Sequence, residues 1–319
     1  MAVNDPPPPM NAPVPRMRLA NLRNPFMRPR PPVPEAPPPP EPVLPGPVVA
    51  VAPAVVPAVR WTPARIAIAD ELWGDGFVVP GGDEEVLRLT VPLGMSEAST
   101  LLLLGAAAGG AARAVVAGLG AWISGHEADP ALAAVAAWRL PRAGKLVAKR
   151  AKVVPWNPQA PVFRRRGFDH ALALEALRGA PGRPVPVAEL LLALAGALRP
   201  GGHLVLVDVV ATGRLDPADP MVRSWAEVEG RTPDLPTEAA LTAALAELRF
   251  DVRVTEDISA RHMRLAAQGW KRLVRDLSAA HPDRPRAAAV VAEAEVWMRR
   301  LKLMHAGQVR LVRWDAIGR

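Results

Sequence analysis

Short apolar runs alternate with amphipathic stretches along the chain from Trp61 onward. The apolar runs have the length of buried strands and predict strands at 100–104, 121–125, 151–155, 168–174, 203–210, 250–256 and 308–316. The amphipathic stretches predict helices at 64–72, 83–92, 109–118, 130–139, 187–198, 237–248, 259–278 and 286–304. Apolar strands separated by helices indicate a mostly parallel sheet that is covered on both faces. We therefore expect an α/β fold with a doubly wound sheet of seven strands.

The first 60 residues follow a different pattern. About half of the 38 prolines of the chain fall there, in runs such as Pro6 to Pro9 and Pro37 to Pro40. Proline at this density prevents helices and central strands. We expect a disordered Pro-rich tail at 1–60 and one domain at 61–319. The tail is either a passive linker or a segment that contacts a protein partner or a membrane surface.

Composition narrows the chemistry. The chain has no cysteine and no tyrosine, which excludes disulfides, thiolate nucleophiles and a tyrosine base. No His, Asp or Glu grouping has the spacing of metal ligands, so no metal is expected. The formal net charge of +8 is interpreted as arginine spread over a solvated surface, and this interpretation argues against a nucleic-acid partner.

The longest apolar stretch is better explained by a strand, a turn and a helix than by a membrane span. It runs from Leu101 to Ile123, carries Arg113 near its centre and is rich in glycine and alanine. The N-terminus lacks the features of a signal peptide. We expect no membrane span and a cytoplasmic location.

The start of this stretch has the pattern of a nucleoside-binding site. The sequence LLLLGAAAGG is an apolar strand followed by a turn in which Gly105 and Gly109 permit unusual backbone angles. The next apolar run ends on Glu127, about 20 positions past the turn, where nucleoside binders place a ribose-binding carboxylate. A glycine-rich turn alone is weak evidence for a nucleoside-binding site, and the position of Glu127 strengthens that evidence.

Four further segments are similar to the class I S-adenosylmethionine-dependent methyltransferases of the small-molecule branch. GFDHALALEAL (167–177) resembles that family's fourth strand, and LRPGGHLVLVD (198–208) resembles its helix-turn-strand segment before the fifth. WGDGFVVPGG (73–82) resembles its lid, and the segment from EDISARHM to GW (256–270) resembles a late part of the branch. The resemblance implies a Rossmann-like methyltransferase fold with an antiparallel last strand and lid insertions at about 61–92 and 259–306.

The resemblance also implies the cofactor S-adenosylmethionine and a small-molecule acceptor. It assigns cofactor contacts to Gly105, Ala106, Ala107, Gly109, Glu127, Ala128, Asn157 and Leu174. Glu175, just past the fourth strand, falls where the family presents its reaction centre, as a catalytic or cofactor-positioning carboxylate. The alternative for Glu175 is a structural carboxylate at a helix start.

Two positions depart from the family pattern. Leu103 stands where the first strand usually ends on an acidic residue, and Ala107 replaces the central glycine of the loop. Together these changes could weaken cofactor binding by a few powers of ten. Two functions therefore stay open: methyl transfer to a small molecule, and a catalytically inactive pseudoenzyme that serves as a binding or scaffold module.

Overall fold

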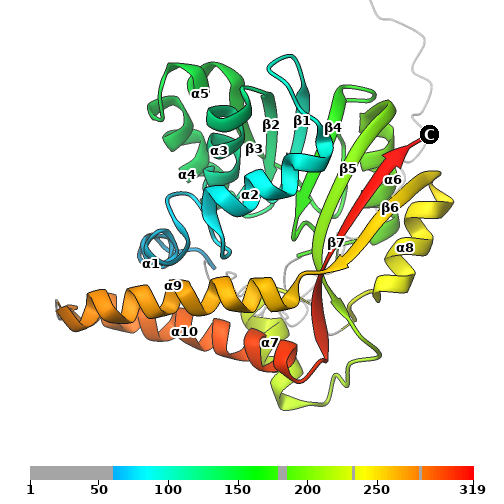
Figure 1. Cartoon of the computed structure of the whole chain (residues 1–319). Helices are drawn as coiled ribbons and strands as arrows, with labels where there is room; N and C mark the ends of the chain where they lie inside the picture. Colours follow the sequence, from blue (N-terminus) through cyan, green and yellow to red (C-terminus); the bar gives the residue numbers. More distant parts are fainter. Residues whose placement is uncertain (1–59, 179–184, 232–233, 280–281) are drawn as a thin grey trace, which may run out of the picture. The chain divides into compact units, whose positions relative to one another are not determined.

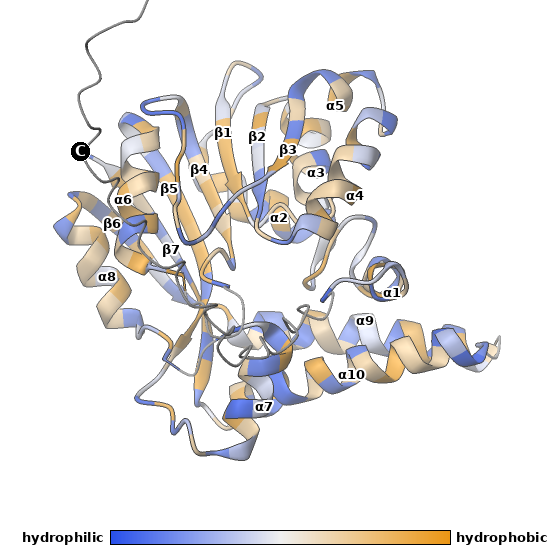
Figure 2. Ribbon diagram, turned by 180° about the vertical axis from the view of Figure 1, so that it is seen from behind, coloured by the Kyte–Doolittle hydropathy of each residue, from blue (hydrophilic) through white to orange (hydrophobic). Residues whose placement is uncertain are grey.

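The leucines of strand β1 (Thr100–Leu104) divide between two hydrophobic clusters on opposite faces of one sheet. Leu101 and Leu103 join one cluster, while Leu102 and Leu104 join the other, because successive side chains of a strand point to opposite faces. The computed structural model describes residues 60–178, 185–231, 234–279 and 282–319. The strands are mostly hydrophobic along this sheet (Figure 2), which agrees with burial on both sides.

The described residues form a seven-stranded sheet in the order β3-β2-β1-β4-β5-β7-β6 (Figure 1). The other strands are β2 (Trp122–Glu127), β3 (Ala151–Pro155), β4 (Phe168–Leu174), β5 (Leu198–Ala211), β6 (Phe250–Asp257) and β7 (Val309–Gly318). Strands β1 to β5 pair in parallel, and β7 runs antiparallel to both β5 and β6. The predicted fold class, including the antiparallel last strand, is confirmed.

Helices cover both faces of the sheet. The cluster of Leu101 and Leu103 includes residues of α2 (Gly82–Thr90), α3 (Gly110–Leu119), α4 (Pro130–Arg139) and α5 (Lys145–Arg150). The opposite cluster includes residues of α6 (Val187–Ala197) and α8 (Glu238–Glu247). Short 3-10 helices at Val91–Leu93 and Leu140–Arg142 follow α2 and α4.

The remaining helices lie beyond the carboxyl ends of the parallel strands (Figure 1). They are α1 (Pro63–Trp73), α7 (Pro220–Glu229), α9 (Ser259–Ala279) and α10 (Arg284–His305). Helix α1 packs against α9 and α10, and α7 packs against α10. The described helices include none long and apolar enough to cross a membrane.

Two helices and one strand extension were not predicted. Helix α5 falls in a basic stretch, and α7 has a start signal that could have been used. Asp219 caps α7 by accepting the Met221 N–H at 2.7 Å, and Pro220 occupies its first turn. Strand β5 begins at Leu198 instead of 203, because Leu198 pairs with Phe168 of β4, and the Pro-Gly-Gly segment forms an irregularity before the pairing resumes at His203. The chain divides into two units, and the first, Met1–Val56, holds most of the predicted tail and lies outside the described residues.

Candidate active site

The loop after β1 requires glycine at its first position. Gly105 has a φ of 69°, and a Cβ there would lie 1.9 Å from the carbonyl oxygen of Leu174 on β4. Ala107 adopts a φ of 50°, which costs a non-glycine residue on the order of 1–3 kcal/mol. Its N–H donates to Oε2 of Glu127 at 2.7 Å, and this bond stabilises the turn. The loop therefore keeps a shape that glycine favours, although alanine occupies it.

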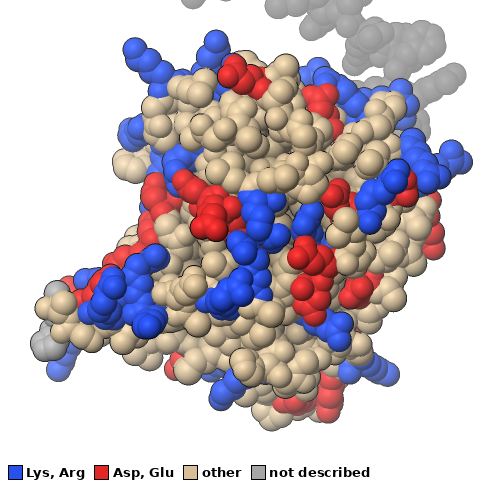
Figure 3. All heavy atoms as spheres, in the orientation of Figure 1, with Lys and Arg blue, Asp and Glu red and all other residues tan. Residues whose placement is uncertain are grey.

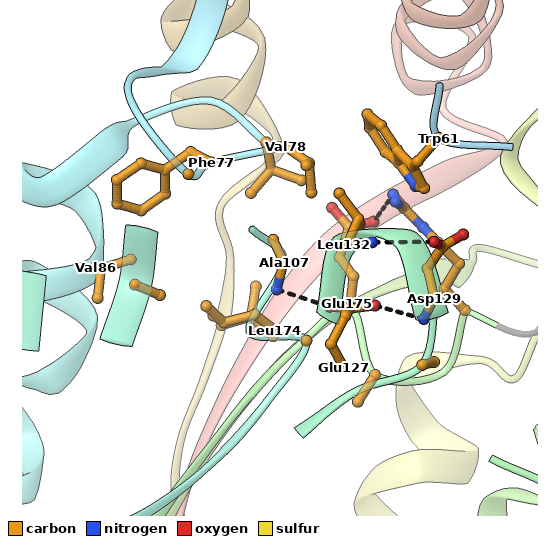
Figure 4. A pocket seen from close by; sticks show the side chains of 18 of the residues that line it. Trp61, Phe77, Val78, Val86, Ala107, Glu127, Asp129, Leu132, Leu174 and Glu175 are labelled. Carbon is orange, nitrogen blue, oxygen red and sulfur yellow. Dashed lines mark hydrogen bonds and ion pairs between the residues drawn. The ribbon is translucent and has the colours of Figure 1, made fainter. Parts of the chain in front are cut away.

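Glu127 connects the end of β2 to this loop. Its side chain is buried, and its second oxygen, Oε1, accepts the Asp129 N–H at 2.9 Å (Figure 4). Burial raises the pKa of Glu127, and the bonds from the Asp129 and Ala107 amides oppose that effect. Because each carboxylate oxygen can accept more than one hydrogen bond, both oxygens keep the capacity to bind a ligand hydroxyl.

A cavity of about 650 Å³ opens at the carboxyl ends of β1, β2, β4 and β5. This volume lies within the range of small-molecule sites, which is about 300–1,000 Å³. Most of the predicted site residues line it: Gly105, Ala107, Glu127, Ala128, Asn157, Leu174 and Glu175. Figure 4 shows Ala107, Glu127 and Glu175 around one space, with Phe77 and Val78 across from Leu132.

Three residues of the predicted loop and strand lie outside this cavity wall. Ala106 is fully buried, and a Cβ on Gly109 would lie 3.3 Å from the Cβ of Ala136 on α4. The predicted contacts of Ala106 and Gly109 are therefore not with the cavity space. Leu103 is 0% exposed and packs in the sheet interior. The departure at Leu103 changes the core beneath the loop, whereas the departure at Ala107 changes the cavity surface.

The two segments that were expected to form a lid contribute unequal numbers of residues to the lining of the cavity. The 61–92 segment supplies Trp61, the loop from Gly76 to Pro80, and residues of α2. The 259–306 segment supplies only His262 and Leu265, near the start of α9. Glu85 joins the two parts, since it pairs with Arg88 at 2.7 Å on α2 and with Arg261 at 2.6 Å on α9.

Glu175 belongs to a buried group of charges that we call the ion-pair cluster. Its members are Glu175, Arg178, Asp208, Glu229, Arg231 and Arg300. Oε1 of Glu175 pairs with Arg300 at 2.6 Å, and Oε2 pairs with Arg231 at 2.7 Å and with Arg178 at 2.5 Å. Arg231 also reaches Asp208 at 3.1 Å. Three guanidinium groups thus face three carboxylates.

This pairing sets the basicity of Glu175. Burial alone would raise the pKa of Glu175, but Arg300, Arg178 and Arg231 together hold it well below its usual range. A carboxylate of such low basicity is a weak proton acceptor. The geometry favours a charge-positioning role for Glu175 over general-base catalysis, and its catalytic assignment stays a prediction.

His262 was not assigned a role from the sequence. It lines the cavity, its side chain is buried, and its Nε2 has no hydrogen-bond partner among the described residues. Burial, reinforced by the charge of Arg300, lowers the pKa of His262 to about 3, so the imidazole is neutral at physiological pH. The buried positions of α9 are Ser259, His262, Ala266, Gly269 and Leu273. That helical spacing is the sequence signal that would have placed His262 on the inner face.

A group of basic residues near the third strand does not line this cavity. Lys145, Lys149 and Arg150 are on α5, and Lys152 is on β3, the edge strand of the sheet. On the face seen in Figure 3, cationic and anionic side chains are interspersed and separated by uncharged residues. This face therefore has no single-sign surface of the kind that tracks a nucleic-acid backbone.

No known family profile matches the chain, and no curated protein matches it by sequence. Several solved structures share its fold. Phosphoethanolamine N-methyltransferase 2 of Haemonchus contortus, in complex with S-adenosyl-L-methionine, has a TM-score of 0.70 at 17% identity, over 82% of this chain and 58% of that chain. A putative sarcosine dimethylglycine methyltransferase from Galdieria sulphuraria has a TM-score of 0.64 at 14% identity, over 80% and 98%.

The cyclase SpnF is also similar, with a TM-score of 0.61 at 18% identity, over 79% of this chain and 92% of that one. The chain spans less than two thirds of the length of the Haemonchus enzyme. At such low identities the likeness defines the fold and not the reaction, because one fold can host different reactions. The protein has the Rossmann-like fold of the class I, S-adenosylmethionine-dependent methyltransferases.

Proposed function

We propose that this protein transfers a methyl group from S-adenosylmethionine to a small-molecule acceptor. The observation that carries the proposal is the bond between the buried Glu127 carboxylate and the Ala107 N–H beside an open cavity. That bond stabilises the positive φ of Ala107, and this supports a loop that a nucleoside can approach closely. Two of the fold relatives are named as methyltransferases, and the Haemonchus protein is named in complex with the cofactor.

The residues around the cavity fit such a cofactor. The free acceptor capacity of Glu127 suits two neighbouring ribose hydroxyls. Trp156 and Asn157 both line the cavity, and Nε1 of Trp156 has no hydrogen-bond partner in the described chain, so this part of the wall can contact a base. Gly105, Ala107 and Leu174 would then lie along the amino-acid portion. When bound, the cofactor supplies an activated methyl group on its sulfonium.

The chain itself has to position the acceptor and keep water out. Phe77, Val78 and Leu265 give the roof an apolar surface, which excludes water. The neutral imidazole of His262 can accept a hydrogen bond from the nucleophilic group of an acceptor and orient it. The ion-pair cluster places fixed charges on the side of the cavity where His262 lies.

Calorimetric titration with S-adenosylhomocysteine tests the first step. We expect micromolar binding to the wild type and a loss of about 10- to 100-fold in Glu127→Gln, since a hydrogen bond to a charged group contributes about 1.5–3 kcal/mol. Glu189→Gln, on the exposed face of α6, is the matched control and should bind normally. Binding by Glu127→Gln as tight as by the wild type would show that the ribose lies elsewhere.

Turnover is tested with methyl-labelled S-adenosylmethionine and a panel of amines, carboxylic acids and phosphate monoesters. Label in an acceptor supports the proposal. Absence of any binding at millimolar cofactor would instead favour the scaffold function, for which the alanine at 107 is the motivating observation.

A further inference from the structure

Arg60 is a cation at the cavity for which the described residues provide no anion. It lines the cavity, its Nε is buried without a hydrogen-bond partner, and no carboxylate of the described chain lies within ion-pair distance. Its neighbour Arg65 is paired with Glu293 at 2.6 Å and stacks at 4.1 Å over the ring of Trp61. Arg60 therefore has no ion-pair partner among the described residues, whereas its neighbour Arg65 has one.

The ion-pair cluster does not neutralise Arg60: Glu229 attracts it without forming an ion pair, while Arg178 and Arg231 repel it. Its three carboxylates, Glu175, Glu229 and Asp208, are already matched by three guanidinium groups. Arg60 would add a fourth cation to that group. Burial, together with repulsion from Arg178 and Arg65, lowers the pKa of Arg60 to about 9. An arginine pKa falls this far only where positive charge is poorly solvated and poorly compensated.

Arg178 lines the same cavity, and its Nη1 makes no hydrogen bond with the described residues. Its Nη2 pairs with Glu175 at 2.5 Å and lies 3.7 Å from Glu229, while its Nε is buried and has no partner in the described residues. A guanidinium group recognises carboxylate and phosphate oxygens through several N–H groups at once. Arg60 and Arg178 thus present donors and excess positive charge to a largely apolar space, where an unpaired charge is costly.

We propose that Arg60 and Arg178 form an anion subsite that receives a carboxylate or phosphate group of the methyl acceptor. The assignment to the acceptor rests on the proposed function. It follows from the position of Arg60: Arg65 donates to the Arg60 carbonyl oxygen at 3.1 Å and pairs with Glu293 of α10, so Arg60 lies on the side of the helices beyond the strands and not on the Gly105 loop, where the cofactor's own carboxylate is expected. The acceptor class is then an acidic small molecule, with its nucleophilic group oriented near His262.

The test uses the full chain saturated with S-adenosylhomocysteine, with inorganic phosphate and acetate as probes at constant ionic strength. We expect saturable binding of at least one probe to the wild type. Arg60→Gln should weaken it about 10- to 100-fold, the loss expected for charge-assisted hydrogen bonds. Arg223→Gln, which removes an exposed guanidinium group on α7, is the matched control and should bind like the wild type.

Stability separates a ligand-binding role from a structural one. Removal of an uncompensated cation should leave the unfolding midpoint of Arg60→Gln unchanged or raised. A clear drop in that midpoint would mean that Arg60 has an anionic partner within the protein, and the subsite would be wrong. Arg178→Gln should also lose probe binding, but its midpoint will fall because it belongs to the ion-pair cluster.

Two further outcomes of the binding experiments distinguish a failure of this proposal from a failure of the proposed function. If the wild type binds S-adenosylhomocysteine but neither probe, the subsite is refuted while methyl transfer stands. If phosphate binds but the nucleoside does not, the subsite stands and methyl transfer fails. 5′-Methylthioadenosine lacks the cofactor's carboxylate. If Arg60→Gln weakens S-adenosylhomocysteine but not 5′-methylthioadenosine, Arg60 binds the cofactor, and the acceptor assignment is overturned.

Discussion

In one part of the cavity wall, which we call the loop end, the N–H groups of Ala107, in the loop after β1, and of Asp129, after β2, converge on the single carboxylate of Glu127. In another part, which we call the charged end, the side chains of the ion-pair cluster meet from β5, α7 and α10 and from the segments that follow β4 and α7. The loop end tolerates alanine at a position that favours glycine, because one hydrogen bond offsets part of the strain. The charged end has no such tolerance, since each buried charge depends on several partners.

The two ends differ in the kind of ligand group that each can bind. The loop end offers hydroxyl acceptors and a close backbone approach, which suit a nucleoside. The charged end holds fixed charges with an excess of positive charge, which suits an acidic acceptor. Four predictions test the contrast, from the largest expected effect to the smallest.

Loss of Glu175 should be the most damaging change. Glu175→Gln removes the charge that three guanidinium groups share, and breaking a buried pair costs about 3–5 kcal/mol. Urea unfolding measures the loss, with Glu227→Gln on the exposed face of α7 as the control. A loss below about 1 kcal/mol would show that the cluster is more hydrated than its geometry indicates.

The loop end depends most on Gly105. Gly105→Ala should cost about 3 kcal/mol, because a positive φ is strained in alanine and the new Cβ would meet the Leu174 carbonyl oxygen. Gly196→Ala in α6 meets nothing within 4 Å and should stabilise the protein by up to about 1 kcal/mol. Equal effects of the two substitutions on the free energy of unfolding would refute the claimed constraint at the loop.

His262 should make the charged end sensitive to acid. Its pKa is about 3 in the folded state and lies below its ordinary value near 6.5, so the unfolded state binds a proton that the folded state does not. The stability contributed by its neutral form is therefore complete above pH 6.5 and is lost as the pH falls toward 3. Between pH 7 and pH 5 the loss should be about 2 kcal/mol.

The contribution of His262 is measured by the free energy of unfolding of the wild type and of His262→Asn at those two pH values. The difference between the two pH values should shrink in the variant. His305→Asn, on the exposed side of α10, should retain the full pH dependence. If both variants match the wild type, His262 is protonated as readily in the folded chain as in the unfolded one.

Relief of strain at Ala107 should have the smallest effect. Ala107→Gly should stabilise the protein by about 0.5–1 kcal/mol, since part of the strain relieved is offset by extra freedom of the unfolded chain. It should also tighten S-adenosylhomocysteine binding by removing a methyl group from the cavity wall. The neighbouring Ala108→Gly should act in the opposite direction, because Ala108 is buried and is not among the residues with a positive φ.

Much of the framework could be predicted from the sequence. The apolar runs and amphipathic stretches located all seven strands and most helices, because strand and helix periodicity are local properties of the chain. The turn at Gly105 and the carboxylate at Glu127 were predicted for the same reason, since they lie about 20 residues apart on consecutive strands. The family resemblance then gave the direction of the last strand, whereas the order of the strands came only from the structure.

The charged end was decided only by the tertiary structure. Glu175 bonds to Arg231 and Arg300, which lie 56 and 125 residues further along the chain, and no spacing rule connects them. Arg60 and His262 likewise acquire their importance from what does or does not surround them in the folded molecule. Local patterns determine which residues form an element. The charge and hydration of a buried side chain depend on the sum of its neighbours, and those neighbours come together only when the chain folds.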